Sequence, residues 1–205
     1  MKRGFDVIIS SLLVLCLSPL ILLLALVIKL KLGSPVIFKQ QRPGLYGKPF
    51  ILYKFRTMAE KYDETGNPLP DAVRLTNVGR WLRKYSLDEL PQLFNVMRGE
   101  LSLVGPRPLL MDYLTLYTEE QYKRHWKKPG MTGWAQINGR NGMSWEERFH
   151  HDVWYVEHWS FWLDLKILLL TTYKVIKPEG ITAPGSETME AFKGSDHVTV
   201  SEGHR

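Results

Sequence analysis

Two neighbouring carboxylates, Asp88 and Glu89, are the strongest candidates for chemistry in this chain of 205 residues. Other acidic pairs exist, but this one lies within a stretch rich in cations, RWLRKYSLDELPQLFNVMRGELSLVGPRP. Cationic side chains favour ionised carboxylates and also attract phosphate groups. An ionised aspartate can act as a nucleophile or bind a divalent metal ion. The pattern therefore predicts a site for one of these two kinds of chemistry.

The same residues also fit a structural pattern. Ser86 to Glu89 reads S-x-x-E, a capping box that begins a helix. Pro91 falls where a helix capped at Ser86 needs a backbone N–H, so either the cap moves to Asp88 or the first turn is distorted. Both versions place two carboxylates at a helix N-terminus, where the helix dipole holds them ionised.

Several basic residues are candidates for binding a substrate phosphate. Arg107 lies between two prolines, which restrict the backbone around its guanidinium. It is therefore a candidate for a rigid fork that binds a phosphate, and a structural salt bridge is the alternative. Lys54 and Arg56 alternate with apolar residues, so on a strand both project from one face, which is either a binding face or a solvated one. Arg140, in the turn NGRNG, can meet a phosphate or merely be exposed.

Asp152 and Asp164 are second-rank candidates. Both fall in predicted helices, and carboxylates on helices are usually surface residues. The six histidines form no metal-binding or catalytic spacing, so they receive no catalytic role. The single cysteine, Cys16, rules out an intrachain disulfide and a zinc cluster of cysteines.

The N-terminal segment, residues 1–32, is the most apolar part of the chain. From Val7 to Ile28 there are 22 residues without a charge, beyond the roughly 18 that mark a membrane segment rather than a core helix. A cleaved signal peptide fits poorly, because the apolar run is long and the following KLKLGSPVIF offers no small-residue cleavage site. This segment is therefore expected to hold the protein in a lipid bilayer.

Ser18 and Pro19 interrupt the apolar run. Proline lacks the N–H that would bond the carbonyl of Leu15, and a break there leaves two arms that each reach about half of a 30 Å hydrocarbon core. The Ser18 hydroxyl can bond a freed carbonyl at the bend. Basic residues flank both ends, which fits a helix that turns back with both ends on the cytoplasmic face. A spanning helix with a proline kink fits these residues equally well.

Residues 33–177 are expected to form a small domain of mixed helices and short strands. VIFKQQRPG and FILYKFRTM predict two strands around the turn RPGLYGKP. T-x-x-Q at 118–121 and S-x-x-E at 144–147 fit capping boxes and predict helix starts near Glu119 and Trp145. From Pro178 onward the polar, Gly- and Ser-rich composition predicts a loosely ordered tail, residues 178–205.

The stretch WYVEHWSFWLDLKILLLTTYKVI gathers aromatic residues beside a short apolar run. An amphipathic helix with aromatic edges and lysines fits the membrane interface, although Trp-rich helices also build protein cores. We favour the interface, because the N-terminal segment already indicates a membrane. The net charge of +6 suits an anionic membrane, a polyanionic substrate or nucleic acid. No zinc-finger, P-loop or dinucleotide motif is present, so nucleic acid is not expected as a partner.

Taken together, the motifs resemble those of the bacterial sugar transferases that are monotopic phosphoglycosyl transferases. The stretches that carry the resemblance are KFRTM, SLDELPQLFNVMRGELSLVGPRPL, KPGMTGWAQINGRN and WSFWLDLKIL. They appear in the expected order, and the match runs from the N-terminal segment to about Val175. The short form looks most like the small PglC type, which begins lipid-linked glycan assembly with N,N′-diacetylbacillosamine phosphate in protein N-glycosylation.

The resemblance implies an α+β monotopic membrane protein on the cytoplasmic face of the bacterial inner membrane. Its anchor is a re-entrant helix-break-helix with Ser18 and Pro19 as the helix-breaking pair, followed by amphipathic interfacial helices and a small cytoplasmic catalytic domain. Asp88 and Glu89 match the family's catalytic dyad. The positions that match charged residues around the family's active site are Lys54, Arg83, Arg107, Arg140 and Asp152.

The implied reaction uses a UDP-sugar, undecaprenyl phosphate and Mg²⁺. Asp88 attacks the β-phosphate, UMP leaves, and the lipid phosphate then takes the sugar phosphate from the aspartate. Mg²⁺ is expected at Asp88, with Glu89 as a second candidate ligand, and downstream glycosyltransferases are expected partners. A scaffold without catalytic activity, which binds anionic lipid or a partner enzyme, is the alternative from another class. The sequence leaves the sugar, the oligomeric state and the destination of the glycan open.

Overall fold

The computed structural model describes residues 1–139, 143–176 and 191–195. Helices and short strands are mixed in it, which confirms the predicted α+β class. The helices are α1 (Lys2–Leu32), α2 (Asp71–Arg74), α3 (Asn77–Lys84), α4 (Gln92–Arg98), α5 (Glu119–Tyr122), α6 (Trp134–Asn138), α7 (Trp145–Glu157) and α8 (Phe161–Ile176). The strands are β1 (Ile37–Pro43), β2 (Pro49–Phe55), β3 (Ser102–Val104) and β4 (Gly130–Thr132), and 3₁₀ turns are η1 (Leu45–Gly47), η2 (Leu87–Glu89), η3 (Met111–Thr115) and η4 (Lys123–Trp126).

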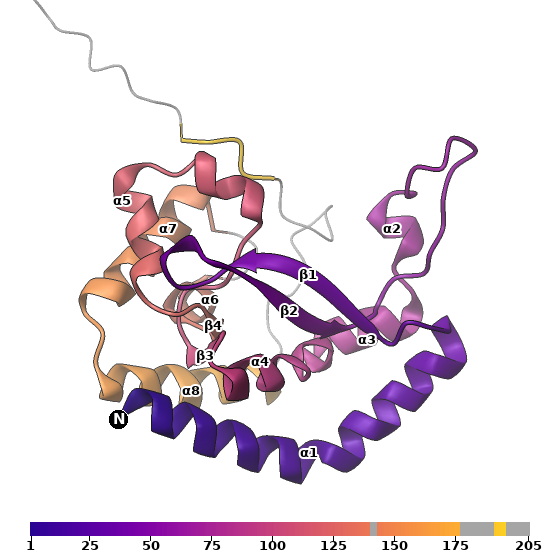
Figure 1. Cartoon of the computed structure of the whole chain (residues 1–205), viewed down its shortest axis with the longest axis horizontal. Coiled ribbons are helices and arrows are strands. Elements are labelled where there is room, and N and C mark those ends of the chain that lie inside the picture. Colours follow the sequence, from indigo (N-terminus) through magenta and orange to yellow (C-terminus); the bar gives the residue numbers. More distant parts are fainter. Residues whose placement is uncertain (140–142, 177–190, 196–205) are drawn as a thin grey trace, which may run out of the picture.

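Two strand pairs organise the domain. β1 and β2 form the predicted antiparallel hairpin, in register from Ile37 opposite Phe55 to Pro43 opposite Pro49. β3 and β4 pair in parallel, with Ser102 opposite Gly130. The hairpin lies above α4, and α1 runs along the opposite side of α4 (Figure 1).

α1 is one continuous helix of 31 residues with Pro19 inside it. Figure 1 shows that it bends near its middle. Ser18 Oγ donates to the carbonyl oxygen of Leu15 at 2.8 Å, which confirms the predicted bond to the group that proline leaves without a donor. The expected break is therefore a bend within one helix rather than an interruption. α1 is also the one helix in the described part of the chain that is long and apolar enough to cross a membrane.

The N-terminal half of α1 is attached to the domain by polar contacts. Asp6 is buried, and its carboxylate accepts hydrogen bonds from Ser102 Oγ at 2.8 Å and from the Leu103 amide at 3.2 Å. Lys2 forms a salt bridge with Asp164 of α8. A buried carboxylate needs such partners, because burial of an unpaired polar group costs free energy. These contacts fix the first turns of α1 against β3 and α8.

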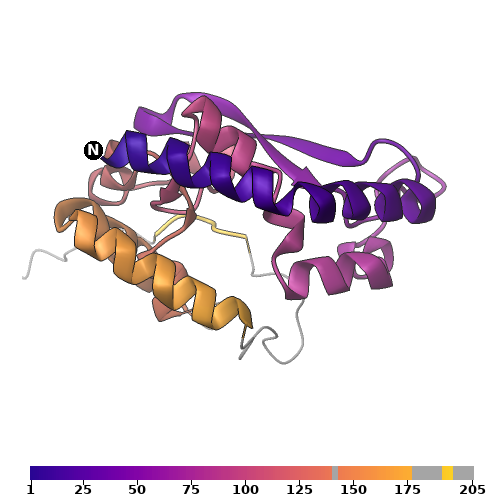
Figure 2. The ribbon, with the colours of Figure 1, turned by 90° about the horizontal axis from the view of Figure 1, so that it is seen from below.

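The C-terminal half of α1 packs through apolar side chains instead. Leu24 and Ile28 form a buried cluster with Phe55 of β2 and Leu82 of α3. α1, α3 and α8 lie along the same face of the molecule (Figure 2). Large apolar side chains are exposed on these helices, including Leu15, Leu22, Leu26, Leu30, Trp81, Trp162, Leu169 and Tyr173. An exposed apolar face of this kind marks a membrane or partner surface.

Both predicted capping boxes form at the predicted positions. Thr118 caps α5, and Ser144 caps α7, each with the reciprocal bond from the third helical residue. Within the predicted tail, residues 191–195 are described. Phe192 of this segment is buried against Tyr113 and Phe149, and its amide donates to the Tyr113 hydroxyl at 3.0 Å. Part of the tail therefore packs on the domain.

Candidate active site

Asp88 and Glu89 lie on the 3₁₀ turn η2, which leads into α4. The Ser86 side chain caps none of the helices that the structure describes. Of the two alternatives that Pro91 left open, the distorted first turn is the one that forms. Ser86 adopts a left-handed conformation with φ of 55°. Such a conformation costs a non-glycine residue about 1 kcal/mol or more and is concentrated at functional sites. The turn presents Glu89 to Lys54 of the hairpin and to Arg107 of the β3–α5 connection.

Glu89 is held by two cations. Lys54 of β2 donates to its Oε1 at 2.8 Å, and Arg107 Nη2 donates to the same oxygen at 2.5 Å. Arg107 Nη1 also lies 3.4 Å from Oε2. Burial alone would raise the pKa of Glu89, but Arg107 and Lys54 together hold it well below its ordinary value. Arg107 thus forms the structural salt bridge that the sequence left open, and Glu89 stays ionised.

Asp88 has a different environment from its neighbour. It is 7% exposed, and its carboxylate accepts no hydrogen bond from any residue in the described part of the chain. Burial raises the pKa of Asp88, the charge of Glu89 adds to the increase, and Lys54, Arg107 and Arg83 oppose it. A helix dipole would lower the pKa of Asp88, whereas the net shift is upward, because burial outweighs the stabilising charges. A desolvated, unpaired carboxylate beside cations is suited to nucleophilic attack or metal binding.

Arg83 and Arg56 take different positions relative to the dyad. Arg83 of α3 acts electrostatically on Asp88, and its Nε donates to Thr57 Oγ1 at 3.1 Å. Arg56 follows the end of β2 and donates to the carbonyl oxygens of Leu32 and Ser34. The structure thus brings Arg83 to the dyad but directs Arg56 to the end of α1. A phosphate-binding role of Arg56 stays a prediction without a supporting contact.

Asp152 of α7 lies in the interior and is 2% exposed. Its Oδ2 accepts from Arg124 Nε at 3.1 Å and from Arg124 Nη2 at 2.7 Å. The same Nη2 donates to the backbone carbonyl of Arg107 at 2.7 Å. Asp152 therefore supports Arg107 through Arg124, and binding of substrate by Asp152 itself stays a prediction. Sequence reasoning missed Arg124, because no local pattern in YKRHW signals a partner 28 residues away.

A comparison with known families covers most of the chain. A family model described as "Bacterial sugar transferase" matches residues 1–178. The chain belongs to the bacterial sugar transferase family. The match includes α1 together with Lys54, Arg83, Asp88, Glu89 and Arg107.

Relatives of this family member fall into two groups by length. "Uncharacterized sugar transferase EpsL" of Bacillus subtilis is 62% identical over 97% of the chain and 98% of that protein. "Exopolysaccharide production protein ExoY" of Rhizobium meliloti is 42% identical over 87% of both chains. "UDP-glucose:undecaprenyl-phosphate glucose-1-phosphate transferase" of Klebsiella pneumoniae is 44% identical over 84% of this chain but 39% of its own. The chain thus spans about two fifths of that longer transferase.

The residues of this sugar transferase also bear on the expected metal ion. Within residues 1–139, 143–176 and 191–195, no three His, Cys, Asp or Glu side chains come close enough to hold a metal by themselves. Mg²⁺ commonly uses one or two carboxylates together with waters and substrate phosphates. The free carboxylate of Asp88 fits this use, whereas both oxygens of Glu89 already face cations. Arg140 lies outside the described residues, so its predicted role has no structural counterpart here.

Proposed function

We propose that the protein transfers a sugar 1-phosphate from a UDP-sugar to undecaprenyl phosphate and releases UMP. The observation that carries this proposal is the buried, unpaired carboxylate of Asp88 beside a Glu89 that two cations hold in place. The names of relatives from Klebsiella pneumoniae and Escherichia coli support the reaction class, since they describe transfer of glucose 1-phosphate to undecaprenyl phosphate. The exposed apolar face of α1, α3 and α8 suits a lipid acceptor.

The first proposed step is nucleophilic. A carboxylate oxygen of Asp88 attacks the β-phosphorus of the UDP-sugar, and the bond from this phosphorus to the bridging oxygen breaks. UMP leaves with the electron pair, and a sugar-phosphoryl aspartate remains. Low exposure to water assists this step, because a poorly hydrated carboxylate is a stronger nucleophile. Glu89 does not compete for the substrate, since Lys54 and Arg107 occupy its oxygens.

The second proposed step returns the enzyme to its starting state. A phosphate oxygen of undecaprenyl phosphate attacks the same phosphorus, the phosphorus–aspartate bond breaks, and Asp88 is regenerated as a carboxylate. Lys54, Arg83 and Arg107 surround Asp88 electrostatically, so they offset the charge of two phosphate-bearing substrates. Mg²⁺, which we propose to bind at Asp88 with Glu89 as a second candidate, supplies further charge stabilisation for the leaving group when it is present.

We propose that α1 enters the cytoplasmic face of the inner membrane and turns back. The start of α1 contacts the domain through Lys2 and Asp6, and its end continues into β1 of the same domain. Both ends therefore contact one domain, which supports a helix that turns back over one that crosses the bilayer. Labelling of a cysteine placed at residue 2, in a Cys16→Ser background, tests this arrangement. Labelling by an impermeant reagent from outside intact cells would contradict it.

The donor sugar is proposed to be N,N′-diacetylbacillosamine or another N-acetylated sugar. Names of relatives refer to glucose and galactose. The decisive experiment therefore compares UDP-linked N,N′-diacetylbacillosamine, another N-acetylated sugar, glucose and galactose as donors. UMP release is measured with purified protein, Mg²⁺ and undecaprenyl phosphate in nanodiscs. We expect release with at least one donor, and its absence with every donor would favour the scaffold alternative. Asp88→Asn should abolish release, whereas Asp112→Asn, which changes an exposed acid, should not.

The covalent step has its own test. Incubation with a donor labelled in the sugar, without the lipid acceptor, should leave label on the wild-type protein and on the Asp112→Asn control. Asp88→Asn should carry none. If the wild type never carries label and both substrates must bind before UMP leaves, transfer is direct and Asp88 is not the nucleophile.

A further inference from the structure

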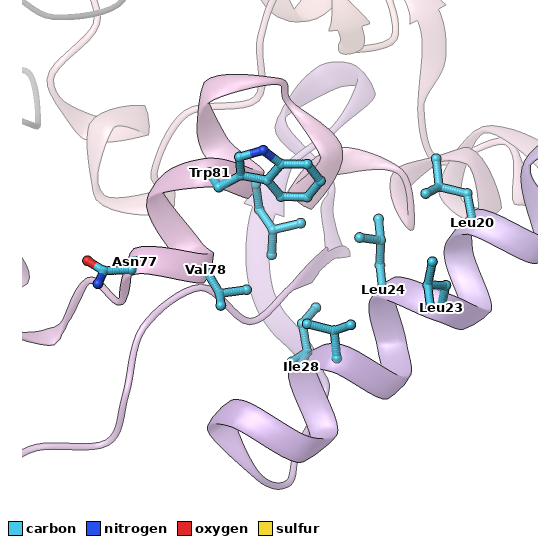
Figure 3. Close-up of a pocket in the computed structure, with 9 residues that line it drawn as sticks. Leu20, Leu23, Leu24, Ile28, Asn77, Val78 and Trp81 are labelled. Atoms are coloured by element: carbon cyan, nitrogen blue, oxygen red, sulfur yellow. The ribbon is translucent and has the colours of Figure 1, made fainter.

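An apolar groove runs between the C-terminal half of α1 and α3. In Figure 3, Leu20, Leu24 and Ile28 of α1 point toward Trp81 and Val78 of α3 across it. The groove has a volume of about 450 Å³, and its lining is Leu20, Leu23, Leu24, Val27, Ile28, Asn77, Val78, Trp81 and Leu82. All of these residues except Asn77 are apolar. A groove with such walls takes hydrocarbon rather than a sugar or a nucleotide.

The groove is continuous with the packing that holds the dyad. Leu24, Ile28 and Leu82 line the groove and also belong to the buried cluster around Phe55. Leu87 and Leu90 pack against this same cluster. These two leucines directly flank Asp88 and Glu89 in the chain. The floor of the groove and the turn that carries the dyad therefore form one packed unit.

α3 also supplies charge on the side of the dyad. Arg83 follows Leu82, which lines the groove, and the charge of Arg83 acts on Asp88. One short helix thus presents apolar side chains to the groove and a cation to the candidate nucleophile. This arrangement matches an amphiphile with a long hydrocarbon chain and an anionic phosphate at one end.

We propose that this groove binds the phosphate-proximal isoprene units of the polyprenyl acceptor and directs its phosphate to Asp88. The inference rests on the proposed function, which makes a polyprenyl phosphate the acceptor. A second apolar hollow on α8, lined by Trp162, Leu165, Lys166, Leu169 and Leu170, serves for comparison. None of its residues belongs to the cluster that packs against the dyad turn, so it is expected to contact bulk phospholipid.

Two tryptophan substitutions on α1 test the groove by kinetics. Val27 is half-buried and lines the groove, whereas Leu26 beside it is exposed and does not line the groove. Val27→Trp should raise KM for undecaprenyl phosphate about tenfold, because it displaces buried hydrocarbon from the groove. Leu26→Trp, which adds the same side chain to the outer face, should leave KM unchanged. Labelling of the protein by the donor alone should be equal in both variants, because that step does not use the acceptor.

Photocrosslinking tests the groove without any turnover. The probe is undecaprenyl phosphate with a benzophenone on the chain near the phosphate, in nanodiscs of phosphatidylglycerol. We expect crosslinked peptides from α1 and α3, and we expect Val27→Trp or unlabelled undecaprenyl phosphate to reduce them. Crosslinks mainly on α8, or crosslinks that undecaprenyl phosphate does not reduce, would overturn the proposal. If no donor gives UMP release, the proposed function fails, and the crosslinking result still decides whether the groove binds polyprenyl phosphate.

Discussion

The buried ion pair between Arg124 and Asp152 gives the sharpest prediction about the support of the active site. Their side chains are 1% and 2% exposed, and Arg124 also donates to the Arg107 carbonyl. Asp152→Asn keeps the shape but leaves the Arg124 charge buried without its counterion. Breaking a buried pair in this way costs about 3–5 kcal/mol, a large part of the 5–15 kcal/mol that typically separates folded from unfolded protein.

Unfolding by denaturant in a fixed detergent or nanodisc measures this loss. Asp152→Asn and Arg124→Met should each lower the free energy of unfolding by about 3–5 kcal/mol. The double variant should lose less than the sum of the two, by about 1–3 kcal/mol, because removal of both charges leaves neither one buried alone. Asp112→Asn, an exposed acid, is the control and should change the free energy by less than about 0.5 kcal/mol.

Kinetics separate this supporting role from direct binding of substrate. If Asp152 acts through Arg124 and Arg107, Asp152→Asn should lower kcat, because Arg107 loses its support and Glu89 then loses a fixed partner. The reasoning is refuted if Asp152→Asn keeps wild-type stability and raises only KM for the UDP-sugar. That result would mean that Asp152 contacts the donor itself.

Three further predictions concern the dyad and the strand pair beneath it. Asp88→Asn should raise the melting temperature at pH 7, because burial and Glu89 raise the pKa of Asp88 and so disfavour its ionised form; the gain should vanish in acid, where the wild-type carboxyl is neutral too. Labelling of the protein by the donor should fall in acid as Asp88 is protonated. Glu89 raises the pKa of Asp88 and Lys54 lowers it. Glu89→Gln should therefore move this fall in labelling to lower pH, and Lys54→Met should move it to higher pH. Gly130→Ala should cost several kcal/mol in unfolding experiments, because its Cβ would lie 2.1 Å from the Gly105 amide nitrogen.

Local patterns in the sequence predicted local structure well. The hairpin, the capping boxes at Thr118 and Ser144, and the Ser18 bond to the Leu15 carbonyl all form as expected. Each depends on residues close together in the chain, where the spacing of polar and apolar side chains determines the hydrogen bonds. Grouping Lys54 with Arg107 around the dyad likewise followed from the family motifs.

The features that sequence reasoning missed depend on contacts between distant segments. Arg124 meets Asp152 and the Arg107 carbonyl only after folding. Asp6 was not recognised as buried, because its partners lie 96 and 97 residues away in β3. The opposite pKa shifts of Asp88 and Glu89 could not be predicted either, since Lys54 and Arg107 act on both carboxylates but, among the described residues, form hydrogen bonds with Glu89 and not with Asp88.

The position of Phe192 has a practical consequence for anyone who shortens this protein. The sequence motifs of the domain end with α8, so the sequence alone gives no reason to avoid a stop codon there. Yet Phe192 is 4% exposed and fills the space between Tyr113, Trp145 and Phe149. Loss of a buried phenylalanine typically costs about 3–5 kcal/mol. A shortened protein made for expression should therefore end beyond Phe192, and a C-terminal tag should be fused after Phe192.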